Sequence, residues 1–375
     1  MAQRPSVQYH SWSGVQGDTF TLSGLRSRCD AFKNILLEHN WSCVVTFDTR
    51  FMAMHYALEV LHILYHAGVK CCYCPSATPL PALERALEQR VADCALIVTA
   101  GNQPYWNLGL LAITPPIPEA PFETTAGSVE EGSPFPSQVP DPNIEQVDLR
   151  SSYIEVLRAS VDIELLRRTT LTMFVDPMHG STSGYLPMAL GDGAQLKAIE
   201  INREADAFFG KQTPHPFDSG VPRLRKLVRE SDSHFGVAFS ANGNALVVVD
   251  NQGDFVSPRE LAIVLGTHLS RQYRQRGVLI VPSESPINPK AGGPRWLEDH
   301  YGLRIEPAYH TAERIAEHVA RDRAALVAGL TNTGEAILGR YTAVPDALLT
   351  ALILTEAVAR SGSKLHQLLN SLRNP

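Results

Sequence analysis

Short apolar runs alternate with amphipathic segments over the first hundred residues, and this alternation limits the fold more than any other feature of the chain. Cys43–Phe47, Val69–Cys74 and Cys94–Val98 are continuous apolar runs with the length of buried strands. The segments between and before them space apolar residues as helices do, and these are Leu25 to Leu36, Met54 to Tyr65 and Pro81 to Arg90. Strands and helices in such short steps predict a parallel sheet covered by helices.

Polar residues next to these segments predict where helices begin and where strands turn. Asp48 and Thr49 follow the strand at 43–47 and are predicted to cap the next helix, whose apolar stripe is Met54, Leu58, Leu61 and Tyr65. Further along, one helix is predicted from Tyr153 to Arg168. A strand ending at Asp176 is followed by a predicted turn at Met178–Gly180.

Two further α/β blocks follow the first. Residues 115–142 are rich in Pro, Glu, Ser and Gly, which indicates a linker or a long surface loop. The predicted organisation is an α/β domain at residues 1–114, a Pro-rich linker at 115–146, and α/β domains at 147–256 and 257–375.

Composition excludes several classes of protein. The chain has 375 residues and a net charge of −6, and without a run of Lys or Arg it is a poor candidate for nucleic-acid binding. No uncharged apolar run approaches the roughly 20 residues that cross a bilayer, and the first residues lack the apolar core of a signal peptide. We therefore expect a cytoplasmic protein that binds neither nucleic acid nor membrane.

The six cysteines lie between Cys29 and Cys94 and are expected to be reduced thiols. Cys71 and Cys74 have C-x-x-C spacing, but they stand in a predicted buried strand and no second pair of ligands has the spacing of a metal site. A place in the core is therefore favoured over zinc or redox chemistry.

Seven segments, in the same order, resemble motifs of the α-D-phosphohexomutases, the family of phosphoglucomutase, phosphomannomutase and phosphoglucosamine mutase. The family motifs are an opening T-S-G-I-R-G, G-x-D-T-R, the phosphoserine loop T-A-S-H-N-P, V-D-P-M-H-G, the metal loop D-G-D-A-D-R, the sugar loop G-G-E-x-S-G and D-G-L-L-T-A-L. The matching segments are Trp12–Asp18, Phe47–Arg50, Thr99–Pro104, Val175–Gly180, Ser240–Ala245, Ala328–Thr333 and Asp346–Leu352.

The resemblance implies a fold and a chemistry. The family folds into α/β domains, each a mixed sheet between helices, around one cleft. A phosphorylated serine exchanges its phosphoryl group with a hexose phosphate, and Mg²⁺ assists. A fourth domain normally holds the substrate phosphate. This chain ends at Pro375, soon after the helix that would lead there, so we expect that domain to be absent.

The chain departs from the family where the chemistry takes place. Gly101 stands at the phosphoserine position, between Thr99 and Asn102. The three metal-ligand positions carry Ser240, Asn242 and Asn244, so three carboxylates are missing. Each charge at about 4 Å is worth roughly 4 kcal/mol at an effective dielectric constant of about 20. We therefore expect no covalent turnover through residue 101, no tight Mg²⁺ site and no cofactor. Cationic and sugar-binding positions have changed too, to Gln16, Ala245 and Leu330.

Several polar residues remain as candidates for binding a ligand, and they are Gln16, Arg50, His179, His310, Arg314 and Asn332. For Arg50, local pairing is favoured over ligand binding, and for His179 a hydrogen-bonded turn. His310 and Arg314 stand where an anion site and a solvated helix start are equally good interpretations.

The leading hypothesis is a non-catalytic binding, scaffold or regulatory protein. The alternative is an enzyme that reuses the cleft for a less charged substrate, with neutral Gln16, Gly101, Asn102, Asn242 and Asn244 as a hydrogen-bonding pocket. A residual sugar-phosphate mutase is the third reading. The expected partners are a protein, a second copy of the chain or a sugar-like small molecule.

Overall fold

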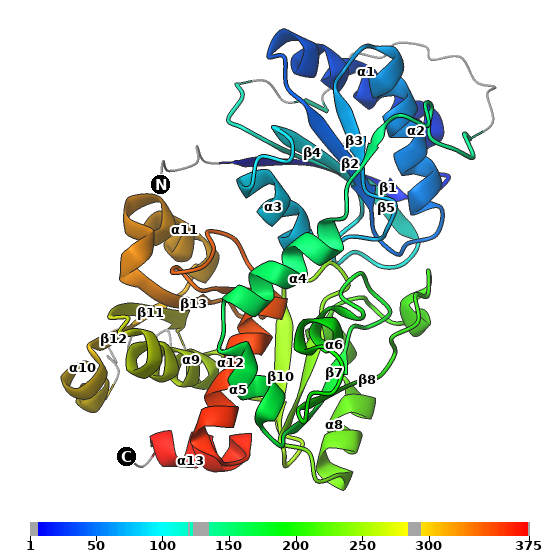
Figure 1. Ribbon diagram of the computed structural model, residues 1–375. Helices are drawn as coiled ribbons and strands as arrows, with labels where there is room; N and C mark the ends of the chain where they lie inside the picture. Colours follow the sequence, from blue (N-terminus) through cyan, green and yellow to red (C-terminus); the bar gives the residue numbers. More distant parts are fainter. Residues whose placement is uncertain (1–6, 119–120, 123–134, 284–293, 374–375) are drawn as a thin grey trace. The chain divides into compact units, whose positions relative to one another are not determined.

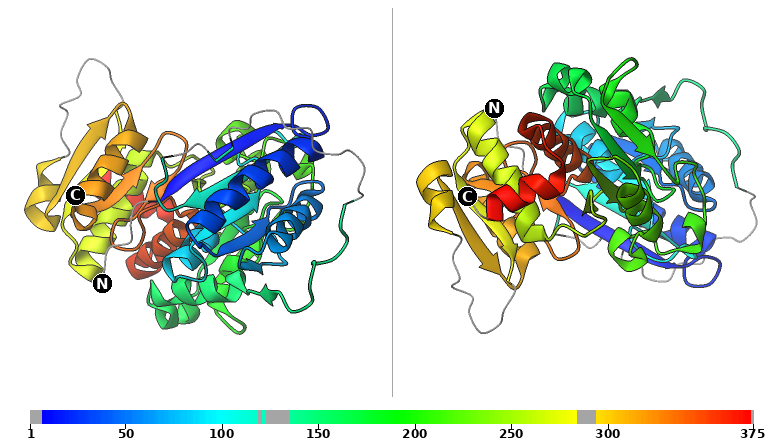
Figure 2. Two further views of the ribbon diagram at one scale, coloured as in Figure 1. Left: turned by 90° about the horizontal axis from the view of Figure 1, so that it is seen from above. Right: turned by 90° about the horizontal axis from the view of Figure 1, so that it is seen from below.

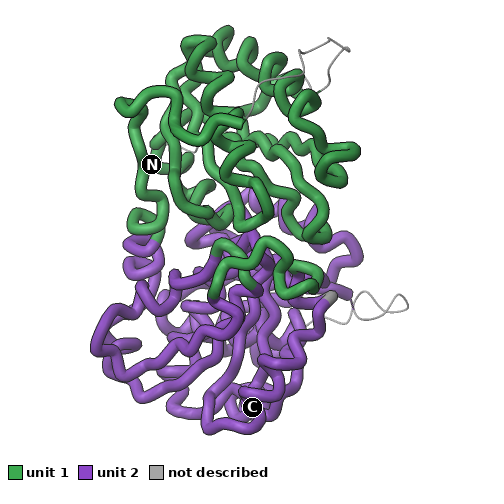
Figure 3. Tube along the Cα trace, turned by 90° about the vertical axis from the view of Figure 1, so that its right-hand side faces the viewer, with its two compact units in different colours: residues 1–153, 179–181, 204–214 green, residues 154–178, 182–203, 215–375 purple. Residues whose placement is uncertain are grey.

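The computed structural model describes residues 7–118, 121–122, 135–283 and 294–373 (Figure 1). They form two compact units (Figure 3). The first contains residues 1–153, 179–181 and 204–214, and the second contains residues 154–178, 182–203 and 215–375. The fold is α/β, as predicted, with three sheets that each mix parallel and antiparallel pairs.

The first unit is built on a six-stranded sheet of order β1-β5-β4-β2-β3-β6. Its strands are β1 (Gln8–Val15), β2 (Cys43–Phe47), β3 (Cys71–Tyr73), β4 (Cys94–Val98), β5 (Asn107–Thr114) and β6 (Glu145–Gln146). The three strands predicted from apolar runs pair in parallel, as expected. β5 runs antiparallel to both β1 and β4, so the sheet as a whole is mixed.

Three helices of this unit come from the predicted amphipathic segments, and they are α1 (Leu22–Glu38), α2 (Ala53–His66) and α3 (Leu80–Glu88). α1 buries Leu25, Cys29, Phe32 and Leu36, the predicted face. The predicted capping of α2 is wrong: the helix begins at Ala53 after Met52, which has no capping hydrogen bond, because the Asp48 carboxylate binds Arg50 and Thr99 instead. Met54 is 42% exposed, so it does not belong to the buried stripe.

The segment predicted as a linker includes residues of the first unit's core and sheet. Residues 119–120 and 123–134 lie outside the described residues. Of the others, Phe122, Phe135 and Ile144 pack on the core, and β6 pairs in parallel with β3.

The C-x-x-C cysteines lie on and beside β3. All six cysteines are free thiols, and burial raises the pKa of Cys71 and of Cys72 to about 12. A thiol with so high a pKa is a poor nucleophile and a poor metal ligand at neutral pH.

The second unit contains two four-stranded sheets. The first has the order β10-β9-β7-β8, with β7 (Thr172–Asp176), β8 (Lys197–Glu200), β9 (Phe235–Phe239) and β10 (Leu246–Asp250). The second has the order β12-β11-β13-β14, with β11 (Gly277–Pro282), β12 (Leu303–Ala308), β13 (Leu326–Leu330) and β14 (Ala336–Ile337).

The helices of the remaining chain are α4 (Leu149–Ala159), α5 (Ile163–Arg168), α6 (Tyr185–Leu190), α7 (Pro216–Ser219), α8 (Pro222–Glu230), α9 (Pro258–Tyr273), α10 (Arg295–Tyr301), α11 (Thr311–Asp322), α12 (Ala347–Ser361) and α13 (Leu365–Arg373). The single helix predicted from Tyr153 to Arg168 is in fact two, α4 and α5. Asp162 starts the second by accepting a hydrogen bond from the Leu165 amide at 3.0 Å.

α12 is the central helix of the second unit. It is buried from Ala347 to Val358 and contacts α9 and β14 of one sheet layer and α5, α6 and β9 of the other. Figure 2 shows α13, which follows it, against α9. Among the described residues, no helix combines the length and the apolar character that a membrane crossing requires.

Candidate functional site

Arg50 holds the loop that carries the phosphoserine-like segment. Its side chain is 1% exposed, and its Nε donates to the Asp48 carboxylate at 3.2 Å. The other guanidinium donors reach the carbonyl oxygens of four loop residues at 2.7 to 3.0 Å, namely Gly101, Gln103, Pro104 and Asn107. A guanidinium has five N–H donors, so all are occupied within the protein. Arg50 thus acts here as the internal support of a loop.

The loop itself offers no exposed nucleophile. The Thr99 hydroxyl donates to Asp48 Oδ2 at 2.6 Å and accepts from the Gly101 amide at 3.0 Å, and this residue is 8% exposed. Gly101 has φ 55°, in the left-handed region that favours glycine. Asn102 is exposed beside it. Burial raises the pKa of the Asp48 carboxyl, and Arg50 and Thr99 only partly offset this effect.

Gln16 and His179 belong to the same unit. The backbone N–H of Gln16 donates to the backbone carbonyl of Trp106, which places Gln16 against the loop that Arg50 supports. His179 lies in a turn with φ 60°, and its Nδ1 is 2.8 Å from the carbonyl oxygen of Glu204. The predicted turn is therefore present, with the histidine bonded inside it.

In the second unit, the loop at the metal-ligand positions bonds to itself. The Ser240 hydroxyl, fully buried, donates to Asn242 Oδ1 at 2.8 Å and accepts from the Ala245 amide at 3.0 Å. Asn242 Oδ1 also accepts from the Asn244 amide at 3.3 Å. The side-chain oxygens of Ser240 and Asn242 are thus hydrogen-bonded within the loop.

This loop does not fit Mg²⁺, which prefers carboxylate oxygens in octahedral geometry. All three side chains are neutral, and the third, Asn244 Oδ1, is buried without a partner in the described part of the chain. One neutral oxygen is too weak a ligand set for a hard dication. Residues 7–118, 121–122, 135–283 and 294–373 also hold no cluster of three His, Cys, Asp or Glu side chains suited to a metal.

The loop at the sugar-binding positions lies next to this one. The Leu246 amide donates to the Gly334 carbonyl at 2.9 Å, and the Ala347 amide at the start of α12 donates to the Gly243 carbonyl at 3.2 Å. The structure therefore brings together the metal-like loop (Ser240–Ala245), the sugar-like loop (Ala328–Thr333) and the start of α12.

A small open pocket of about 220 Å³ lies beside the sugar-like loop. It is lined by the predicted candidates His310 and Asn332, together with the carboxylates Glu313 and Glu335. Arg314 is directed elsewhere: it binds Glu306 and also Glu317, at 2.7 Å in the latter case, and these carboxylates raise its pKa. Arg314 is not among the residues that line this pocket with His310.

The sequence did not single out Glu313 and Glu335. The Glu335 Oε2 atom accepts from the Thr331 and Thr333 hydroxyls at 3.2 and 3.3 Å, so it organises the sugar-like loop. The signal that could have found it is its position directly after that loop in the sequence.

Comparisons with known proteins agree with the fold. Two family models match the chain, "Phosphoglucomutase/phosphomannomutase, alpha/beta/alpha domain I" over residues 7–121 and "alpha/beta/alpha domain II" over residues 151–253. The chain is 26% identical to phosphoglucosamine mutase of Staphylococcus saprophyticus over 229 residues, which cover 59% of this chain and 46% of that one. It is 24% identical to phosphoglucosamine mutase of Myxococcus xanthus, covering 77% and 63%. The match thus spans about half to two thirds of these relatives.

Solved structures show the same architecture. A phosphoglucomutase/phosphomannomutase family protein from Burkholderia thailandensis has a TM-score of 0.74 at 19% identity, covering 97% of this chain and 79% of that one. The parafusin phosphoglucomutase of Paramecium has a TM-score of 0.69 at 13% identity, covering 98% and 76%.

Proposed function

Because the chain belongs to the α-D-phosphohexomutase family, we propose that it is a non-catalytic member, kept as a binding, scaffold or regulatory protein. The observation that carries the proposal is the loop at 99–107. Its phosphoserine position is a glycine with φ 55°, and its neighbouring hydroxyl, Thr99, is bonded to Asp48.

Phosphoryl transfer makes three demands of a protein: a nucleophilic oxygen, a cation on the phosphate oxygens, and positive side chains for the developing charge. Gly101 supplies no oxygen. Arg50 has given all its donors to the protein, so it would have to leave a carbonyl unbonded to reach a phosphate. These observations support the loss of the family reaction.

The metal-like loop supports the same proposal independently. Its neutral oxygens replace three carboxylates, and Ser240 and Asn242 are bonded to each other. A dication there would first have to break that hydrogen bond and would gain no charge neutralisation in return.

The first test is turnover. Purified protein is assayed for phosphoglucomutase, phosphomannomutase and phosphoglucosamine mutase activity with Mg²⁺ and a sugar bisphosphate activator, beside an active family enzyme as the positive control. We expect no product above the blank. Metal-dependent turnover by this chain would refute the proposal.

The second test is metal affinity, with Mn²⁺ as a paramagnetic substitute for Mg²⁺. Equilibrium dialysis of the wild type should show no stoichiometric Mn²⁺. The variant Ser240→Asp/Asn242→Asp/Asn244→Asp restores the three family carboxylates and is expected to bind Mn²⁺ more tightly than wild type. Equal, tight binding by the unmodified chain would contradict the argument from its donor set.

A second candidate function is chemistry on a less charged substrate, and the pocket beside the sugar-like loop favours it. His310 shares the lining of this pocket with two carboxylates, Glu313 and Glu335, which would repel a phosphate but accept hydrogen bonds from hydroxyls. A thermal-shift screen with sugars, nucleotide sugars and other metabolites tests it. Stabilisation by one class, lost in Glu335→Gln and kept in the exposed control Glu317→Gln, would support this candidate, whereas no shift would favour a protein partner or a second copy.

A further inference from the structure

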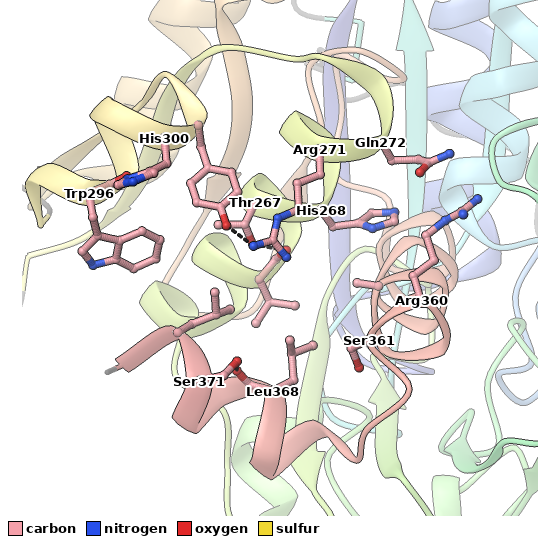
Figure 4. Close-up of a pocket in the computed structure, with 14 residues that line it drawn as sticks. Thr267, His268, Arg271, Gln272, Trp296, His300, Arg360, Ser361, Leu368 and Ser371 are labelled. Carbon is pink, nitrogen blue, oxygen red and sulfur yellow. Dashed lines mark hydrogen bonds between the residues drawn. The ribbon is translucent and has the colours of Figure 1, made fainter. Parts of the chain in front are cut away.

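A second pocket lies in the second unit, among α9, α10, α12 and α13 (Figure 4). Its volume is about 710 Å³, within the range of roughly 300 to 1,000 Å³ that is usual for small-molecule sites. Figure 4 shows Trp296 and His300 of α10 on one side and His268 and Arg360 on the other. No motif of the sequence pointed to it.

The titratable side chains that line this pocket are mostly basic. Its described lining contains two arginines and two histidines and no carboxylate. Arg360 is paired with two carboxylates outside the lining, Glu356 at 3.0 Å and Asp162 at 2.9 Å. Arg271 differs: it donates to the Tyr301 hydroxyl, and its guanidinium lies 5.0 Å from the centre of that ring. Within the described ranges no carboxylate is bonded to Arg271, so its charge is available to an anion.

The remaining lining residues are a mixture of apolar side chains and neutral polar ones, the latter being Thr267, Gln272, Ser361 and Ser371. The apolar ones are Val264, Ala357, Leu368 and Leu372, and the half-buried indole of Trp296 adds an aromatic surface. An inorganic anion would leave these side chains in contact with water, whereas an anion that carries an apolar group would cover them. The rings of Trp296 and Tyr301 lie close together, with their centres 5.8 Å apart. Aromatic side chains favour contact with other flat rings, so this surface suits an aromatic ligand.

The wall of the pocket is fixed by a buried polar group. His268, 8% exposed, has its Nε2 3.2 Å from Glu356 Oε2. Glu356 is fully buried and also accepts from the Tyr273 hydroxyl at 2.8 Å. The side chains of His268 on α9 and Arg360 on α12 are thus held by Glu356 before any ligand arrives, which reduces the entropy cost of binding.

This pocket is separate from the loops of the proposed function. The start of α12 touches Gly243 of the metal-like loop, whereas the pocket uses Ala357 to Ser361 at the other end of the same helix. At about 1.5 Å per residue, the pocket residues of α12 lie roughly 15 to 21 Å from the start of the helix. Binding here therefore does not depend on the fate of the family reaction.

We propose that this pocket binds a small aromatic carboxylate, with its anionic group on Arg271 and its ring on the apolar surface beside Trp296. The charge-assisted hydrogen bond selects the carboxylate, and the apolar lining selects the ring.

Isothermal titration calorimetry of the whole chain with 2-naphthoate tests the proposal, with the neutral 2-naphthamide as the matched ligand. We expect one site per chain, and affinity at least about tenfold weaker for the amide, since it lacks the charge. Arg271→Gln should weaken 2-naphthoate by about tenfold or more, whereas Arg274→Gln, an exposed arginine outside the pocket, should leave it unchanged.

Three results with 2-naphthoate and its amide would overturn the proposal, and a fourth comes from the phosphate ligand below. The first three are no saturable heat up to about 1 mM 2-naphthoate, equal affinity for the acid and the amide, and equal effects of the two arginine substitutions. The comparison of ligands on the wild type needs no variant, so it decides even if Arg271→Gln folds poorly. 2-Naphthyl phosphate in parallel shows whether the site prefers a carboxylate; tighter binding of the phosphate would contradict the carboxylate assignment.

Discussion

Both units of the molecule contain a buried carboxylate beside an arginine near a candidate site, and the pair Asp48–Arg50 behaves differently from the pair Glu356–Arg360. Asp48 in the first unit has Arg50 and Thr99 as partners, and burial raises its pKa. Glu356 in the second unit is fully buried too, and burial alone would raise its pKa. Hydrogen bonds from its neighbours, His268 among them, outweigh burial and hold that pKa below its ordinary value.

The difference lies in how each arginine is shared. Arg50 divides its donors between one carboxylate and four backbone carbonyls, whereas Arg360 gives Nε and an amino group to Glu356. In the first unit, Arg50 therefore holds a loop in place. In the second unit, Arg360 and Glu356 join helices around a pocket. Near the positions that match the family's catalytic motif, the charge of Arg50 is thus bonded to the protein itself.

The largest effect is expected from removing the first arginine. Arg50→Met leaves Asp48 buried without its cation and four loop carbonyls without a donor. We expect a loss of about 3 to 5 kcal/mol in the free energy of unfolding of the first unit. Urea unfolding followed by tryptophan fluorescence measures it, because three of the four tryptophans lie in that unit: Trp12, Trp41 and Trp106.

The matched control is Arg314→Met. This arginine also binds two carboxylates, Glu306 and Glu317, but its side chain is 44% exposed. Surface pairs contribute little, so the loss should be several times smaller. Equal losses for the two variants would mean that burial of the Arg50 pair has no special role.

The second prediction removes the charge of the other carboxylate. Glu356→Gln keeps the shape of the side chain but weakens its hydrogen bonds to His268, Tyr273 and Arg360. We expect a loss of about 1.5 to 3 kcal/mol, seen as faster amide hydrogen exchange in α12. Glu317→Gln on the surface should leave α12 exchange unchanged. Unchanged exchange in the Glu356 variant would remove the basis for a pre-formed pocket wall.

The third prediction returns a serine to the family position. Gly101→Ser places a side chain at φ 55° and is expected to cost about 1 to 2 kcal/mol of stability without restoring turnover. Asn102→Ser introduces the same hydroxyl at the neighbouring exposed position and should cost less. Mutase activity in the Gly101 variant would show that the missing nucleophile was the only barrier.

The smallest effect is expected from lowering the pH. The resulting change in the free energy of unfolding has opposite signs for Glu356 and Asp48. The lowered pKa of Glu356 stabilises the folded state above its ordinary value of 4.5, and this contribution is lost as pH falls through the lowered pKa. The raised pKa of Asp48 has the opposite sign: as pH falls towards 3.8, its protonation favours the folded state. Hydrogen exchange at pH 6 and below pH 4.5 should therefore show α12 losing protection more in the wild type than in Glu356→Gln. An equal loss in both would contradict the assignment.

The sequence predicted the elements that bury apolar runs. Cys43–Phe47 and Cys94–Val98 are strands, and the face of α1 is correct, because burial leaves a periodic signal. Edge strands leave a weaker periodic signal in the sequence. β1 alternates half-buried and exposed positions, and β6 is an exposed pair of residues inside a Pro-rich segment. The break between α4 and α5 was missed although Asp162 is a good capping residue.

The sites were harder to predict, because their contacts join residues far apart in the chain. Motif order identified the segments that match the family loops. It could not show that Arg50 supports a loop more than fifty residues away, or that Arg271 and Trp296 line one pocket with residues of α13. Such contacts follow from tertiary packing, which local patterns do not encode.

The first unit is not one continuous stretch of sequence, since residues 179–181 and 204–214 belong to it. Phe209 from the second of these segments is 2% exposed, with its ring centre 5.1 Å from the Arg50 guanidinium. A recombinant fragment that stops at residue 153 would leave that guanidinium without its aromatic neighbour. A fragment that ends at residue 214 would keep Phe209 but would divide the second unit, since residues 154–178 and 182–203 belong to that unit. A single cut in the gene therefore does not separate the two units.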